Sequence, residues 1–302
     1  MTSAQYDKLY RILLERRAAT PRSTDPVAQR ATMDREALPV ADDVHAQVTV
    51  LGGVPAEMVA AAGAAESDIT LYVHGGGFCV GSPQTHRKLA GDISRASGTT
   101  CAVIDYRLAP EHPLPAAIDD CVEAYGALVD SHGADRIAIA GDSAGATIAV
   151  MALTRLAGSG LPMPVAAVAI SPWIDYRCAG RDYAEKAAID PVILLAELHG
   201  YAEWFLGDQD PCDSALTPLT AELRGLPPLL VHSGTRDVTS GDANTLVARA
   251  RDAGVDVTHR VVPDMCHVWH VFAGRVPEST VAVCDVGAFV RCRLTQAARV
   301  SA

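Results

Sequence analysis

A serine flanked by two glycines is the strongest chemical signal in this sequence of 302 residues. It lies in Ala140-Gly-Asp-Ser143-Ala-Gly145, between an apolar run over 135–140 and an alanine-rich helical pattern over 146–157. This order predicts a buried strand that turns sharply into a helix, with the Ser143 hydroxyl at the corner. The glycines leave room where strand and helix approach each other. A serine at such a corner, beside free N–H groups of the helix N-terminus, is typical of a nucleophile.

Three consecutive glycines form a second motif, His74-Gly-Gly-Gly77, directly after the apolar run that ends at Val73. They free the backbone to turn several N–H groups into one concavity. Taken alone, the serine motif also fits an ordinary strand–helix turn, and the triplet fits a flexible loop. A hydrolase needs both, because the tetrahedral oxygen formed at the serine must meet preorganised donors. Together they predict a serine nucleophile beside an oxyanion-binding loop.

A third motif, Asp105-Tyr-Arg-Leu-Ala-Pro-Glu-His-Pro-Leu-Pro-Ala116, lies between these two. In this combination the chain resembles the hormone-sensitive-lipase-like family of α/β-hydrolases, whose bacterial members are carboxylesterases. The similarity extends from about residue 40 onward, through Ile170-Ser-Pro-Trp-Ile-Asp175, Gly225-Leu-Pro-Pro-Leu229 and the segment from Asp256 to His267.

The resemblance implies a site and a domain plan. The oxyanion hole would consist of the N–H groups of Gly76, Gly77 and Ala144. Residues 1–43 would form an N-terminal cap helix and linker, and residues 44–302 the catalytic domain, with 172–225 as an inserted cap segment. Relatives often dimerise through the last strand, so a homodimer is possible. The chemistry calls for neither a metal nor an organic cofactor.

The base of such an enzyme must be a histidine, and the hydrolase chain order is serine, acid, histidine. Of ten histidines, His267 and His270 fall just beyond the predicted strand over 255–262. His267 lies in the immediate loop, whereas His270 belongs to the next segment and is interpreted as a packed or surface side chain. The family usually has His-Gly-Phe here, and this chain has His267-Val-Trp269.

The acid should follow the strand that ends near Ser233. Asp237 lies in that loop, and Asp242 is its rival further along. Asp242 opens a helical pattern over 242–253, so helix capping already explains it. Asp237 is therefore the predicted acid. Asp142, next to the serine, and Glu111, in the proline-rich loop, are interpreted as structural.

The order of the predicted elements indicates an α/β fold. A helix over 4–19 and a loop over 20–43 precede an edge hairpin (44–50 and 54–60), after which strands alternate with helices. The strands cover 69–73, 99–104, 135–140, 165–170, 229–232 and 255–262, and the helices cover 88–97, 116–130, 146–157, 242–253 and 276–291. We therefore expect the α/β-hydrolase fold, a mostly parallel eight-stranded sheet with helices on both faces. The segment 172–225 shows helical patterns over 187–205, which fits a helical cap.

Composition excludes several classes of partner. The net charge of −11 argues against nucleic acid or an anionic membrane as the main partner. The N-terminal residues lack a secretory pattern, and no apolar run approaches the ~20 residues needed to span a bilayer. The eight cysteines are scattered, without Cys-x-x-Cys spacing, and are expected to be reduced and mostly buried. These features predict a cytoplasmic protein that acts on small molecules.

The sequence thus predicts a serine carboxylesterase for short or medium-chain esters, with Ser143, His267 and Asp237 as its triad. An amidase or lactonase could use the same groups. A non-catalytic receptor on the same scaffold is a further alternative. Plant hormone receptors resemble this family but lack the histidine, whereas here every candidate residue is present.

Overall fold

The protein is described by a computed structural model that covers residues 2–19, 23 and 25–300. Its centre is one eight-stranded sheet in the order β1-β2-β4-β3-β5-β6-β7-β8. The strands are β1 (Val44–Leu51), β2 (Val54–Ala61), β3 (Ala65–Val73), β4 (Thr99–Ile104), β5 (Ile137–Asp142), β6 (Ala166–Ile170), β7 (Leu229–Gly234) and β8 (Val257–Val262). The first two pairs, β1·β2 and β2·β4, are antiparallel, and all others are parallel. The predicted eight-stranded, mostly parallel sheet is confirmed.

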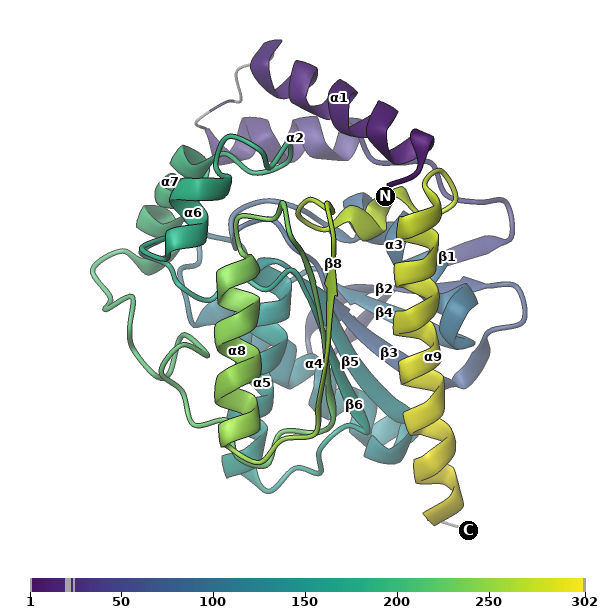
Figure 1. The fold of residues 1–302 in the computed structure, drawn as a ribbon. Coiled ribbons are helices and arrows are strands. Elements are labelled where there is room, and N and C mark those ends of the chain that lie inside the picture. Colours follow the sequence, from purple (N-terminus) through teal and green to yellow (C-terminus); the bar gives the residue numbers. More distant parts are fainter. Residues whose placement is uncertain (1, 20–22, 24, 301–302) are drawn as a thin grey trace.

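Helices cover both faces of the sheet (Figure 1). One face carries α4 (Ala116–His132), α5 (Ala144–Ser159) and α8 (Ser240–Asp252), and the other carries α3 (Pro83–Ser97) and α9 (Pro277–Val300). The central strands β4, β5 and β6 are buried along their whole length, as expected for strands covered on both sides. Their apolar runs are therefore continuous rather than alternating, which is the pattern seen in the sequence.

The hairpin at the start of the sheet follows the prediction closely. Gly52 and Gly53 join β1 to β2 with φ angles of 57° and 88°. Two consecutive residues with positive φ form the turn that matches the twist of a two-residue hairpin, and glycine adopts it without strain. The hairpin places β1 at one edge of the sheet, and β8 forms the other edge.

The predictions for segments 20–43 and 187–205 are wrong in part. The segment 20–43 was expected to be a loop, but α2 (Pro26–Arg35) lies within it, and positions 20–22 and 24 fall outside the described residues. The Asp25 side chain accepts the Val27 N–H at 3.0 Å and proline occupies the first turn, so residues interpreted as loop punctuation are a helix start. Within 187–205, helix α7 begins only at Leu195, after a loop that separates it from α6 (Arg181–Lys186).

Four helices gather at one end of the sheet, namely α1 (Ala4–Ala19), α2, α6 and α7 (Leu195–Leu206) (Figure 1). The helix predicted over 4–19 is confirmed as α1. Within the described part of the chain, no helix combines the length and apolar character that crossing a bilayer requires. All eight cysteines are unpaired, and five of them are buried (Cys79, Cys101, Cys121, Cys178 and Cys266), as predicted.

Candidate active site

Ser143 occupies the sharp corner between β5 and α5. Its backbone has φ 53° and ψ −123°, a strained conformation for a residue with a side chain, and only 7% of the residue is exposed. A Cβ atom on Gly141 would lie 2.5 Å from the carbonyl oxygen of Gly145, and one on Gly145 would lie 2.1 Å from that of Val73. Neighbouring backbone atoms thus leave no room for a side chain at either position. This is the reason for the two glycines that the sequence pattern suggested.

The glycine triplet follows β3 and runs beside this corner. Gly76 and Gly77 have φ angles of 120° and 58°, and a Cβ on Gly76 would lie 2.1 Å from the carbonyl oxygen of Val80. Among the hydrogen bonds of the described residues, none is donated by the N–H groups of Gly76, Gly77 or Ala144. These are the three groups that the family resemblance implies for the oxyanion hole, and they are available to an external acceptor.

The Asp142 side chain holds the glycine triplet in place through hydrogen bonds. Its Oδ1 accepts the Tyr72 hydroxyl at 2.7 Å and the Gly75 N–H at 3.1 Å, while Oδ2 lies 3.5 Å from Nε2 of His86. Burial alone would raise the pKa of Asp142, but His86 and Tyr72 lower it below its ordinary value. The carboxylate therefore fixes the loop rather than taking part in chemistry. Glu111, the other acid interpreted as structural, forms an ion pair with Arg30 at 2.7 Å.

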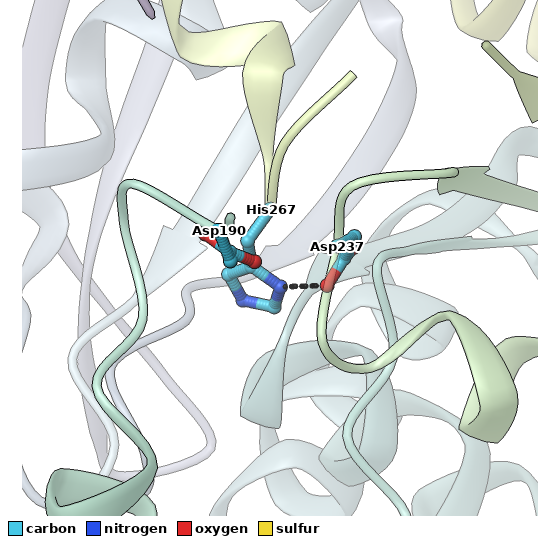
Figure 2. Close-up of side chains that lie close together, drawn as sticks. All are labelled: Asp190, Asp237 and His267. Atoms are coloured by element: carbon cyan, nitrogen blue, oxygen red, sulfur yellow. Dashed lines mark hydrogen bonds and ion pairs between the residues drawn. The ribbon is translucent and has the colours of Figure 1, made fainter. Parts of the chain in front are cut away.

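Asp237 and His267 form a buried pair. Oδ1 of Asp237 lies 2.9 Å from Nδ1 of His267, and the same oxygen accepts the N–H and hydroxyl of Thr239 (Figure 2). Burial opposes ionisation of both groups, but their mutual attraction is larger, so the pKa of Asp237 is lowered and that of His267 is raised. The pair consists of an ionised carboxylate hydrogen-bonded to an imidazole, and it becomes an ion pair when the imidazole is protonated. This arrangement can orient a histidine base.

The two loops that carry this pair are joined directly. Asp237 follows β7 and His267 follows β8, and the Arg236 N–H donates to the Met265 carbonyl oxygen at 3.0 Å. A Cβ on Gly234 would lie 2.1 Å from that oxygen, so only glycine permits this approach. This contact explains the glycine in Gly234-Thr-Arg-Asp237.

The order of the strands brings Ser143 to the same end of the sheet as the pair. Ser143, Asp237 and His267 follow β5, β7 and β8, whose carboxyl ends lie at the same end of the parallel sheet. Nε2 of His267 is buried and has no hydrogen-bond partner among the described residues. This ring nitrogen is therefore available to accept a proton, and catalytic hydrogen bonds are often long until substrate binds.

The residue after the histidine departs from the family pattern, and the structure shows how it is accommodated. Val268 has φ 46° and ψ 42°, the left-handed region that glycine would occupy without strain. Its N–H donates to the Ser171 hydroxyl at 3.1 Å, and its side chain is buried among apolar residues of the α9 side. Burial of the valine offsets the backbone strain, so the loop keeps the turn without glycine.

His270 and Asp242, the alternatives to His267 and Asp237, have other partners. His270 is fully buried, its Nε2 is 2.9 Å from Nδ1 of His232, and burial holds its pKa well below the ordinary value. Asp242 does not cap its own helix as expected. It accepts the N–H groups of Ile174 and Asp175, at 2.6 and 2.8 Å, and burial raises its pKa to about 7. Its role is to tie the inserted segment to α8.

One acidic residue near the pair was missed. Asp190, in the loop between α6 and α7, is fully buried, and one ligand-type atom each of Asp190, Asp237 and His267 lie within 4.8 Å of one another. Groups of this kind can hold a metal ion; here the Asp190 carboxylate accepts the Val192 and Val238 N–H groups, and Oδ1 of Asp237 is paired with Nδ1 of His267. The sequence held one local signal, because an aspartate before Pro191 favours a turn over a helix.

Helices from the N-terminal and inserted segments contact this centre. The Tyr6 hydroxyl of α1 donates to the Asp264 carbonyl at 2.8 Å and accepts the Cys266 N–H at 3.0 Å, next to His267. In α7, the ring of Tyr201 lies so close to Gly77 that a Cβ there would be 2.3 Å from it. Both the histidine loop and the glycine triplet are therefore covered by helices.

Comparisons with known proteins agree with this geometry. Residues 70–271 match a family described as the alpha/beta hydrolase fold. An acetyl-hydrolase of Streptomyces hygroscopicus is 41% identical over 222 residues, which are 73% of this chain and 74% of the relative. An esterase of Acinetobacter venetianus RAG-1 is 31% identical over 268 residues (87% and 88%). The crystal structure of an esterase from the bacterial hormone-sensitive lipase family has a TM-score of 0.92 and 39% identity, covering 97% of this chain and 99% of that one. The chain therefore belongs to the α/β-hydrolase fold family and, within it, to the bacterial hormone-sensitive-lipase family of esterases.

Proposed function

We propose that the protein is a serine carboxylesterase that forms an acyl-enzyme on Ser143. The observation that carries the proposal is the Asp237–His267 pair at 2.9 Å, at the same end of the sheet as the strained Ser143 corner. Relatives of similar length named esterase and acetyl-hydrolase support ester hydrolysis. The triad of Ser143, His267 and Asp237 expected from the sequence is therefore part of this proposal.

In this mechanism the Ser143 oxygen attacks the ester carbonyl carbon while Nε2 of His267 takes its proton. Asp237 holds the imidazole and stabilises its cation, and the N–H groups of Gly76, Gly77 and Ala144 bind the oxyanion. His267 then gives the proton to the departing alcohol oxygen as the C–O bond breaks. Water, deprotonated by His267, cleaves the acyl-enzyme, and the acid leaves while the proton returns to Ser143.

A fluorophosphonate probe tests the nucleophile directly. We expect it to label the protein at Ser143 in a one-to-one ratio, because only an activated serine attacks phosphorus at a useful rate. Peptide mapping by mass spectrometry locates the label. Ser143→Ala is the control, and equal labelling of that variant would refute the assignment.

The substrate class follows from the covering helices. Ser143 is only 7% exposed, and α1, α2, α6 and α7 lie at its end of the sheet, so residues 1–43 and 172–225 are proposed to act together as a cap (Figure 1). We therefore expect soluble esters with short or medium acyl chains to be preferred over emulsified long-chain triglycerides. Rates with p-nitrophenyl esters of graded chain length measure this preference. A jump in activity above the substrate's solubility limit would contradict an enclosed site.

Two further features belong to the proposal. A homodimer through β8 is supported by the position of that strand at the sheet edge, where Val261 is 51% exposed. A cytoplasmic location is supported by the eight unpaired thiols.

A further inference from the structure

Asp190 stands out because a buried carboxyl group has no assigned role in the triad chemistry. It comes from the inserted segment, on the loop between α6 and α7, and reaches the Asp237–His267 pair from outside the sheet. Figure 2 shows the three side chains converging from three separate loops. One polar atom from each lies within 4.8 Å of the others, and Asp190 and Asp237 are both completely buried.

The carboxyl group of Asp190 is held in place by backbone donors on two sides. Its Oδ1 accepts the N–H groups of Val192 at 2.8 Å and Ile193 at 3.2 Å, which closes a turn of its own loop. Its Oδ2 accepts the Val238 N–H at 3.1 Å, on the residue directly after Asp237. The last bond crosses from the inserted segment to the acid loop, so the position of this carboxyl is fixed relative to the pair.

The other ionisable groups that face Asp190 leave its charge largely uncompensated. Besides Asp237 and His267 these are Cys266, next to His267, and Tyr10 and Arg17 of α1. Burial raises the pKa values of the Cys266 thiol and the Tyr10 phenol, so both are neutral. The Arg17 guanidinium donates to the main-chain carbonyl of Asp190 and not to its carboxylate. Arg17 thus stays charged but binds the main chain, and among the described residues around the two carboxylates His267 is the group that becomes a cation on taking up a proton.

We propose that Asp190 is a second carboxylate acting on His267, a positioning residue through which the inserted segment strengthens the base once it is seated over the site. The inference rests on the proposed esterase mechanism. During attack by Ser143, His267 becomes a cation, and two buried carboxylates stabilise that cation more than one. Burial, followed by the charge of Asp237, raises the pKa of Asp190 to about 6, so the group is ionised above neutrality, where the enzyme needs it.

The negative charge of Asp190 determines the direction in which it shifts the pKa of His267. A negative group near His267 raises its pKa, so removing Asp190's charge must lower it. Activity requires neutral His267, and kcat/KM therefore falls as the pH drops through the pKa of His267. We call this fall the acid limb of the pH–rate profile. In Asp190→Asn we expect its midpoint to move to lower pH by about one unit, the smallest effect typical of a charge at such a distance. At the plateau we expect kcat to fall about tenfold, because the imidazolium in the transition state loses one partner.

Three variants make the test specific. Asp190→Asn and Asp190→Ser both remove the charge while keeping an oxygen that can accept the Val192 N–H, so the local turn is retained in either one. Asp242→Asn is the matched control, because Asp242 is also a buried carboxylate that binds backbone N–H groups of the inserted segment, but it is absent from the Asp237–His267 group. Circular dichroism confirms folding of each.

The acid limb is measured twice, from kcat/KM with p-nitrophenyl acetate and from the pH dependence of the fluorophosphonate labelling rate. A shift to lower pH in both Asp190 variants, with Asp242→Asn unshifted, is the expected result. A limb that coincides with the wild type, or an equal shift in Asp242→Asn, would overturn the role of Asp190. If the wild-type protein is not labelled at Ser143, the proposed mechanism itself fails, and this outcome is distinguishable because it needs no variant of Asp190.

Discussion

Replacing His267 with alanine is expected to lower kcat by about 10⁶-fold, because the serine then has no base to take its proton. The residual rate would come from the oxyanion donors and substrate binding alone. Measurement of kcat with p-nitrophenyl acetate over the pH range checks this. Since the Asp237–His267 bond is buried, circular dichroism is needed to show that the variant remains folded.

His270→Ala is the matched comparison, because both histidines are buried and lie three residues apart. Its ring bonds to His232, on the α9 side of β7, and not to an acid of the site. We expect the folded variant to keep kcat within about tenfold of the wild type, since distant surroundings of a triad affect rate far less than its members. Should His270→Ala be the inactive variant, the assignment of the base is wrong.

The second large effect is expected for Asp237→Asn. Asparagine keeps the shape, but its amide cannot stabilise the imidazolium and favours the wrong tautomer of His267, so kcat should fall by about 10³–10⁴-fold. The Thr239 donors to Oδ1 remain available to the amide oxygen, which favours an intact fold. Active-site titration with the fluorophosphonate probe, combined with kcat, separates slow catalysis from misfolding.

Asp242→Asn is again the control. The two N–H groups of Ile174 and Asp175 and the Tyr183 hydroxyl all meet one oxygen of Asp242, and an amide oxygen can take its place. We expect less than about tenfold loss of kcat. Loss in Asp242→Asn with full activity in Asp237→Asn would reverse the assignment of the acid.

The parts of the site that the sequence predicted are those encoded locally. The Ser143 corner needs glycines within two residues on either side, and the strand before it is a continuous apolar run, so both were visible in a short window. The same holds for the Gly52-Gly53 hairpin. Asp237 and His267 could be proposed as acid and base because the strands that precede them fix where their loops emerge.

What the sequence could not show depends on contacts between distant segments. Asp190 lies next to residues that follow it by 47 and 77 positions (237 − 190 and 267 − 190), and the apolar pattern around it resembles a helix. Asp242 has the spacing of a helix cap, but the N–H groups it binds belong to residues 174 and 175. In both cases tertiary hydrogen bonds outweighed the local preference.

Helix α1 has a consequence for the order in which the enzyme matures. Its Tyr6 hydroxyl bonds to a residue 258 positions later in the chain, so the helix leaves the ribosome long before its partner exists. At about 5–20 residues per second the delay is on the order of ten to fifty seconds. An isolated helix of 16 residues is marginally stable in water, and α1 therefore folds late, against a nearly finished domain. Because the same hydroxyl holds the loop of His267, the proposed base reaches its final position only when α1 docks, and we expect a nascent chain to become active late in its synthesis.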